Sequence, residues 1–134
     1  MDQETINIMI KKVITTEKAP TAIGPYSQAI LAGNTLFCSG QIAIEPETSS
    51  LITHSITEET HQVMKNISNV LKAANMDFSN VVKSSIFIKN MNQYADINQV
   101  YASYFNNNPP ARETVEVSVL PMDTNIEISV IAVK

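Results

Sequence analysis

The chain has 134 residues, of which 44% are hydrophobic and 16% are charged, and its formal net charge is −4. This size and composition predict one soluble globular domain over residues 1–134, with residues 1–9 as a frayed or extended N-terminus. No run of lysine and arginine exceeds two residues, which excludes the electrostatic footprint of a nucleic-acid-binding protein. No apolar run approaches the roughly 18 residues of a membrane span, and the acidic N-terminus is unlike a secretory signal.

Cysteine and histidine are scarce. Cys38 is the only cysteine, so no internal disulfide can form and a reducing cytoplasm is the expected location. The two histidines, His54 and His61, match no metal-binding spacing, and both are predicted to face solvent. With three glycines in all, the chain has no glycine-rich phosphate loop. We therefore expect neither a metal nor a cofactor.

The N-terminal third predicts a strand hairpin that follows an ordered loop. The loop at residues 17–26 contains Pro20, Gly24 and Pro25, which suit a fixed turn better than a helix. Gly33 and Asn34 then form a two-residue turn between two short runs of strand-forming residues. The strands expected in this third are residues 11–15, 27–32 and 35–39.

Two helices are predicted from apolar residues that recur every three or four positions. The first spans residues 57–74, with Thr57 as its N-cap and Asn75 as its left-handed stop. The second runs from a cap at Asn90 to about Asn106. The inward-facing residues are expected to be Val63, Ile67, Val70, Leu71 and Ala74 in the first helix and Tyr94, Ile97, Tyr101, Tyr104 and Phe105 in the second.

The segment at residues 109–121 joins a stiff turn, one arginine and a strand. Pro109 and Pro110 each fix φ and lack a backbone donor, so the chain enters Arg112 rigidly. A guanidinium fork held in this way suits a planar carboxylate, although an ordinary surface arginine fits the same position. Valines at every second position then predict a strand with one buried face. These valines are Val115, Val117 and Val119.

Two more strands are predicted at residues 81–89 and 124–134, which completes the order β-β-β-α-β-α-β-β. This order predicts an α+β fold with two helices on one face of a sheet. Several strands are apolar at both alternating positions, so we expect the opposite face to be buried in an oligomer whose sheets pack together. The residues concerned are Ile42, Ile44, Val115, Val117, Ile131 and Val133.

Three further places are candidates for chemistry. Glu127 lies between two isoleucines, so its carboxylate either pairs with an arginine or has a pKa suited to a general acid or base. Tyr26 follows a rigid Gly-Pro turn and either packs internally or lines a pocket. Ser39 and Gly40 end a strand, where a glycine lets a ligand approach the backbone closely. No histidine is placed by any motif beside a nucleophile, so covalent catalysis is not predicted.

The motifs GPYSQA at 24–29, SGQ at 39–41, PARETVEV at 110–117, LP at 120–121 and EI at 127–128 occur in this order. In this combination the chain resembles the RidA/YjgF family of imine deaminases, also called endoribonuclease L-PSP. The resemblance covers residues 19–133, and the arginine and its strand are its most diagnostic part.

The resemblance implies a chorismate-mutase-like fold in a homotrimer, whose sheets form a barrel-like core with a ligand cleft at each subunit interface. It implies hydrolysis of reactive 2-imino or enamino acids, such as 2-iminobutanoate and 2-iminopropanoate, to 2-keto acids and ammonia. Pyridoxal-phosphate enzymes release these imines, and the protein would protect such enzymes without holding their cofactor. The expected ligand is therefore a small 2-imino or 2-keto carboxylate.

The resemblance also implies roles for individual residues. Arg112 matches the arginine that binds the substrate carboxylate, and Glu127 matches the acid that positions or activates water. Other matched positions lie around the same cleft, where Thr114 contributes its backbone. These positions are Tyr26, Ser39, Gly40, Asn98 and Thr114.

The chain departs from the family pattern in three places. Glu113 follows Arg112 where a small serine or threonine is usual, but strand alternation predicts that the two side chains face apart. The loop at 48–50 lacks a turn glycine, and Asn75 replaces a glycine after the first helix. Two other functions stay open. One is an endoribonuclease that inhibits translation, which the acidic charge disfavours. The other is a non-catalytic or chaperone-like protein that binds small carboxylates in the same cleft.

Overall fold

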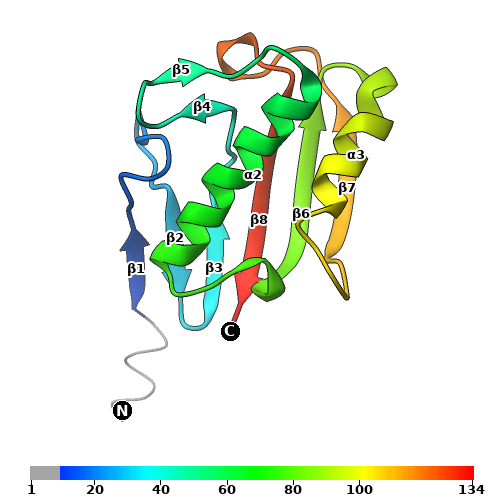
Figure 1. Cartoon of the computed structure of the whole chain (residues 1–134). Coiled ribbons are helices and arrows are strands. Elements are labelled where there is room, and N and C mark those ends of the chain that lie inside the picture. The colour runs from blue at the N-terminus through cyan, green and yellow to red at the C-terminus, as the bar shows by residue number, and fades with distance from the viewer. Residues whose placement is uncertain (1–9) are drawn as a thin grey trace.

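The computed structural model describes residues 10–134, so the expected N-terminal extension at residues 1–9 lies outside the described part of the chain. Over residues 10–134 the chain forms a six-stranded sheet, a two-stranded hairpin and two α-helices (Figure 1). The order in the sheet is β1-β2-β3-β8-β6-β7, and neighbours are antiparallel except for the parallel pair β6 and β7. The strands of this sheet are β1 (Lys11–Ile14), β2 (Ala29–Ala32), β3 (Thr35–Cys38), β6 (Val81–Ile88), β7 (Ala111–Glu116) and β8 (Ile126–Val133). The remaining elements are the hairpin strands β4 (Ile44–Glu45) and β5 (Ser50–Leu51), the helices α2 (Ile56–Ala73) and α3 (Tyr94–Ala102), and the short 3-10 turns η1 (Phe78–Asn80), η2 (Met91–Gln93) and η3 (Pro121–Asp123).

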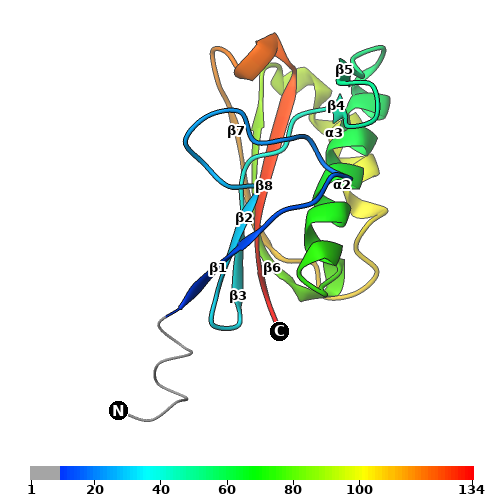
Figure 2. The same ribbon diagram turned by 90° about the vertical axis from the view of Figure 1, so that its left-hand side faces the viewer.

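Both helices pack on the same face of the sheet, which confirms the predicted α+β arrangement (Figure 2). The long connection between β1 and β2 first passes α2, where the side-chain amide of Asn69 donates to the carbonyl of Lys18 at 2.8 Å, and its later part extends on the opposite side of the sheet. Among the described residues no helix covers that opposite side. We call it the free face, and it carries Phe37, Phe87, Val115 and Glu127 on neighbouring strands. None of the helices described for residues 10–134 is long and apolar enough to cross a membrane.

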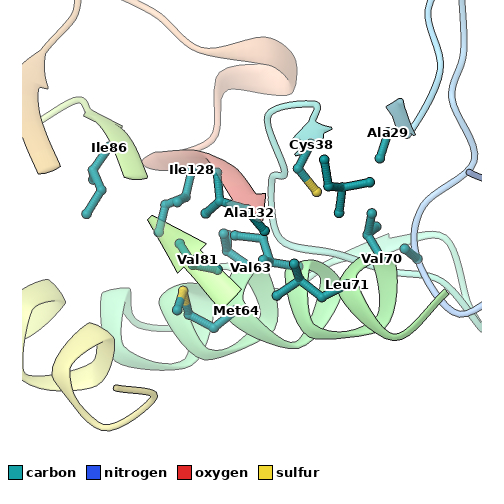
Figure 3. Packing of buried hydrophobic residues seen from close by; sticks show 14 of the residues in the cluster. Ala29, Cys38, Val63, Met64, Val70, Leu71, Val81, Ile86, Ile128 and Ala132 are labelled. Carbon is teal, nitrogen blue, oxygen red and sulfur yellow. The ribbon is translucent and has the colours of Figure 1, made fainter. Parts of the chain in front are cut away.

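The core lies between α2 and the sheet and follows from the alternation along β8. Ile126, Ile128, Val130 and Ala132 are all buried, as predicted, whereas the residues between them face the other way. Burying a large aliphatic side chain contributes about 1.5–3 kcal/mol, so this cluster firmly fixes the strand that carries Glu127. The residues of α2 that belong to the same cluster include Val63, Met64, Val70 and Leu71 (Figure 3).

The N-cap of the first helix lies two residues earlier than predicted. Ser55, not Thr57, is the N-cap: its backbone is extended and its Oγ accepts the backbone N–H of Glu58 at 3.1 Å. Both hydroxyl residues can cap a helix, and only the backbone conformation decides between them. The predicted stop is confirmed, because Asn75 has a φ of 58° and its N–H donates to the carbonyl of Lys72 at 2.9 Å.

The second helix is shorter than predicted. Asn90 caps η2, the turn that precedes α3, and its side chain accepts the N–H of Asn92 at 2.9 Å. The helix α3 then covers nine residues. Beyond α3 the N–H groups of Tyr104 and Phe105 bond three residues back, at 3.1 and 3.2 Å, so the chain tightens before it turns away. The predicted aromatic face still packs together without a continuous helix, since Tyr101 lies 4.8 Å from Phe105 between ring centroids.

One of the two histidines differs from the prediction. His54 is exposed, as expected, but His61 is partly buried and its Nδ1 lies 2.8 Å from the hydroxyl of Tyr104. His61 lies on the surface of α2 and contacts an aromatic side chain from a distant segment of the chain. Residue spacing along the sequence does not reveal such a contact. The hairpin of β4 and β5 was likewise predicted only as a loop, because two-residue strands show no periodicity.

The side chains of β7 that face the helices are not the valines that were predicted to be buried. β7 pairs with β6 so that Arg112 lies beside Ser84 and Thr114 beside Ile86. Both β6 residues are buried beneath the helices, so Arg112 and Thr114 also face the helices. Val115 therefore lies on the free face and is 40% exposed, and the prediction of a buried valine face within the chain is wrong. Alternation along an edge strand does not show which of its faces the helices cover.

Candidate active site

Arg112 points from β7 toward α3. Its Nη1 donates to Oδ1 of Asn98 at 2.6 Å, and its Nη2 donates to the hydroxyl of Tyr94 at 2.6 Å. Asn98 and Tyr94 lie four residues apart, so one face of the helix presents both acceptors. The guanidinium carbon also lies 5.0 Å from the ring centroid of Tyr101 and 5.6 Å from that of Tyr94, within the range of cation–π attraction. These contacts hold the guanidinium in one position, with Asn98 beside it.

The guanidinium of Arg112 has no carboxylate partner within residues 10–134. The ion pairs of this region join Lys83 to Glu113 and Lys89 to Asp123. Arg112 is half-buried, so water hydrates its charge incompletely, and its neutral protein partners leave that charge uncompensated. Charged hydrogen bonds from a guanidinium to a carboxylate are among the stronger ones in proteins. The arrangement is therefore suited to bind a small carboxylate.

Glu113 faces away from Arg112, as strand alternation predicted. It lies beside Ser85 in the sheet, and its carboxylate accepts from the hydroxyl of that serine and from Nζ of Lys83, the latter at 2.8 Å. The hydrogen bonds from Lys83 and then Ser85 lower the pKa of Glu113. This carboxylate is therefore engaged on the free face and does not compete for the guanidinium.

Thr114 lies on the same side of β7 as Arg112. Its Oγ1 is buried and has no hydrogen-bond partner among the described residues. Buried hydroxyl groups usually have a partner, because losing water without replacement is unfavourable. The resemblance implied a role for the backbone of Thr114, and the structure adds its hydroxyl as a second polar group on the side where Arg112 lies.

Glu127 lies at a different place, on β8 and on the free face. It borders a cavity of about 560 Å³, which is also lined by Tyr26, Ser39 and Gly40. Burial raises the pKa of Glu127, and among residues 10–134 its carboxylate accepts no hydrogen bond. The structure thus brings together four of the predicted site residues. A carboxylate with a raised pKa beside an open cavity is suited to proton transfer.

Gly40 is required by space rather than by backbone conformation. A Cβ atom at this position would lie 2.6 Å from Oε2 of Glu127 and 2.7 Å from its Cδ. The glycine was expected to let a ligand approach the backbone, but the group that approaches it here is the side chain of Glu127. Gly40 therefore determines where the carboxylate lies in the cavity.

Hydrogen bonds from Gln28 hold the loop that forms the cavity wall. The amide of this buried residue donates to the carbonyls of Thr16 and Pro20, at 3.0 and 2.8 Å, and accepts the N–H of Thr16 at 2.7 Å. The hydroxyl of Ser39 donates to the carbonyl of Ser27 at 2.6 Å, which ties the end of β3 to the same loop. Tyr26, in this loop, is exposed and is one of the residues that line the cavity.

Glu59 positions the strand that carries Glu127. It is fully buried in α2, and its carboxylate accepts both the backbone N–H of Asn125 at 2.8 Å and the side-chain amide of Asn125 at 2.7 Å. Asn125 immediately precedes β8, so this contact fixes the start of the strand. From the sequence, Glu59 was only an acidic residue in the first turn of a helix, so its contact with Asn125 was not predicted. The contact between Tyr94 and Arg112 was also missed, because Tyr94 was predicted only as an inward-facing packing residue.

Within one chain the predicted site residues form two groups. Glu127 pairs with Phe87 on the free face, whereas Arg112 pairs with Ser84 on the face that the helices cover. We call the group of Arg112, Asn98 and Thr114 the arginine half, and the group that lines the cavity with Glu127 the glutamate half. The strands turn these two side chains to opposite faces of the sheet, and the cleft expected at a subunit interface stays a prediction.

Other reactive groups lie outside both halves. Cys38 is buried beneath the helices, and burial raises the pKa of its thiol to about 12, so it is neutral and unreactive. Over residues 10–134 no three histidine, cysteine or acidic side chains cluster in a way that could hold a metal ion.

An arginine without a carboxylate partner and a cavity lined by an acid thus lie on one α+β sheet in the described part of the chain. The chain matches the family described as Endoribonuclease L-PSP over residues 16–134. It is 51% identical over 123 residues to a RutC family protein of Sulfurisphaera tokodaii, covering 92% of this chain and 98% of the relative. It is 44% identical over 126 residues to the 2-iminobutanoate/2-iminopropanoate deaminase of Rattus norvegicus, covering 94% and 92%.

Solved structures agree with these relatives. A crystal structure of a protein of the conserved Rid protein family from Yersinia pestis superposes with a TM-score of 0.91 at 48% identity, covering 93% of this chain and all of that one, 100%. The chain therefore belongs to the endoribonuclease L-PSP family, which confirms the resemblance found from the sequence motifs.

Proposed function

We propose that this protein is a deaminase that hydrolyses reactive 2-imino acids, including 2-iminobutanoate and 2-iminopropanoate, to 2-keto acids and ammonia. The observation that carries the proposal is the half-buried guanidinium of Arg112, which only neutral groups contact. A planar substrate carboxylate would complete its hydrogen bonding and its charge. Relatives that are named as deaminases of these imines support the same assignment.

The active form in this proposal is a homotrimer whose sheets form a barrel-like core. The free face supports it, because Val13, Phe37 and Val115 expose apolar side chains there that a neighbouring sheet would cover. The placement of the two halves on opposite faces supports it further. The arginine half of one subunit would meet the glutamate half of the next, so that each interface contains one complete site.

The hydrolysis then divides between these halves. Arg112 holds the carboxylate, and backbone groups near Gly40 and Thr114 orient the protonated imine. Glu127 accepts a proton from water as the water oxygen bonds to the imine carbon, which gives a 2-amino-2-hydroxy acid. Glu127 then returns its proton to the nitrogen, the C–N bond breaks as the hydroxyl oxygen forms the keto C=O bond, and the proton of that hydroxyl passes to the released ammonia, which leaves as ammonium. Catalysis rests on positioning and proton transfer, without a covalent enzyme intermediate.

Coupling the protein to a threonine dehydratase tests the proposal. The wild type should accelerate decay of the 2-imino acid that the dehydratase releases, and Arg112→Ala should abolish that acceleration. Lys65→Ala is a matched control, because it removes an exposed cation on α2 outside both halves. Failure of the wild type to accelerate decay, or full activity of Arg112→Ala, would refute deamination at this site.

The same preparation distinguishes the other two functions. Cleavage of RNA that depends on Arg112 would favour the nuclease meaning of the family name, although the net charge of −4 opposes it. Binding of a 2-keto acid that depends on Arg112 without any turnover of imine would indicate a carboxylate-binding protein. In cells, the proposed reaction would protect the pyridoxal-phosphate enzymes that imines damage.

A further inference from the structure

Two consecutive residues beside the cavity have left-handed backbone conformations. Met122 has a φ of 56° and Asp123 a φ of 55°, and neither is a glycine. Residues other than glycine are strained at such positive φ angles, so the surrounding structure must impose this backbone conformation. Strained residues of this kind cluster at ligand-binding and switch sites.

The imposed conformation has visible causes. Thr124 is fully buried, and both its N–H and its hydroxyl donate to the carbonyl of Pro121, at 3.3 and 3.0 Å. The N–H of Asp123 donates to the carbonyl of Leu120 at 2.9 Å, and its carboxylate pairs with Lys89. These contacts fix the turn from both ends and leave the side chain of the residue between them directed outward.

The turn places an exposed apolar side chain at the cavity. Met122 is 62% exposed and lines the same cavity as Glu127. Ile23, from the loop between β1 and β2, also lines the cavity and is 84% exposed. Two large apolar side chains from separate loops thus lie exposed around one acid-lined cavity, where water contact is unfavourable unless a ligand covers them.

We propose that Met122 determines substrate specificity by contacting the side chain of the 2-imino acid, with Ile23 as the second apolar contact. This inference rests on the proposed deamination and extends it to substrate choice. Met122 and Glu127 line the same cavity, so with the reacting carbon at Glu127 an apolar substituent on that carbon is placed on the side of Met122, whose flexible thioether adapts to chains of different length. The site therefore prefers imines with longer apolar side chains over the imine with a single methyl group.

Comparing two imines measures this preference. An amino-acid oxidase generates 2-iminopropanoate from alanine and the longer imine from norvaline, and the release of 2-keto acid is followed for each. Removing apolar contact with a few methylene groups should lower kcat/KM for the longer imine about fivefold to twentyfold in Met122→Ala, with less than about a twofold change for 2-iminopropanoate. The loss should lie in KM, because the contact is the same in the bound substrate and in the transition state. Met122→Leu should retain the preference.

Two further variants separate the side chain from the turn. Met122→Gly accepts the left-handed conformation without strain, so it should fold at least as well as the wild type and still lose the preference. Met91→Ala removes another exposed methionine that does not line the cavity and should leave the ratio of the two imines unchanged. An unchanged ratio in both Met122→Ala and Met122→Gly overturns the inference while deamination stands. A wild type that hydrolyses neither imine overturns the proposed function itself.

Discussion

The arginine half and the glutamate half of the candidate site are built in opposite ways. Around Arg112 every side-chain hydrogen-bond acceptor comes from α3, and the guanidinium is also covered by aromatic rings. Around Glu127 there is an open cavity with apolar walls, and the carboxylate lies against Gly40 without a hydrogen-bond donor in the described part of the chain.

The difference follows from what each half would have to do. A substrate carboxylate needs a fixed positive charge, which a rigid hydrogen-bonded arginine supplies. Proton transfer needs a carboxyl group whose pKa is raised, and partial removal from water supplies that more readily than hydrogen bonding, which would lower it. In the proposed function, one chain would therefore provide a preorganised anion site and a proton-transferring acid, on different faces of its sheet.

The largest expected effect comes from separating the two halves. Arg112→Ala and Glu127→Gln should each lower kcat/KM by about 100-fold to 10,000-fold, because each removes one function that the other cannot replace. Co-expressing the two variants with different tags, and purifying through both tags, yields mixed assemblies. In a mixed trimer one interface joins an intact Arg112 to an intact Glu127, so about one third of wild-type activity should return. No recovery in verified mixed trimers would place both halves in the same subunit.

Gly40→Ala should disturb the glutamate half with little effect on folding. The added methyl group meets the flexible end of Glu127, so the carboxylate moves and kcat/KM should fall about tenfold or more, since small displacements of catalytic groups are costly. Gly33→Ala is the matched control. Gly33 has open space around it but a φ of 61°, so this variant should lose about 1 kcal/mol of unfolding free energy and keep its activity. Denaturation and activity measurements test both expectations. Full activity in Gly40→Ala, or a loss of activity without a loss of stability in Gly33→Ala, would contradict them.

Tyr94→Phe should weaken the arginine half only slightly. It removes one acceptor from the guanidinium while the ring and the contact to Asn98 remain. We expect KM for the imino acid to rise about threefold to tenfold with a smaller change in kcat, because the lost hydrogen bond acts on the substrate only through the position of Arg112. Tyr104→Phe removes a hydroxyl that contacts His61 instead and should leave KM unchanged. Equal effects of the two substitutions would show that Tyr94 acts only through general stability.

The smallest expected effect concerns pH. Because burial raises the pKa of Glu127, kcat/KM should fall on the acid side at a pH above that of an ordinary glutamate, near 4.3. The folded chain binds this proton more tightly than the unfolded chain does, so Glu127 lowers stability as pH rises through the interval between the two pKa values. Glu127→Gln should therefore be at least as stable as the wild type at neutral pH and gain nothing at low pH. Denaturation at both pH values measures this, and a clear loss of stability at neutral pH would mean that the carboxylate is structurally required.

Local patterns in the sequence were enough to identify most of the long elements and the family. A period of two in β8 and a period of three to four in α2 are properties of neighbouring residues, so the buried faces of both were correctly predicted. The motifs around Arg112, Tyr26 and Gly40 sufficed to identify the family without knowledge of the fold.

Only the tertiary structure decided which way the site residues point and what supports them. Alternation placed Arg112 and Glu113 on opposite sides of β7, but the pairing with β6 decided that the arginine, and not the valines, lies under α3. Likewise Glu59 supports the start of β8 through contacts between segments far apart in the chain. Periodicity is set by the geometry of one strand, whereas register and layer order depend on its neighbours, and these contacts leave no local pattern.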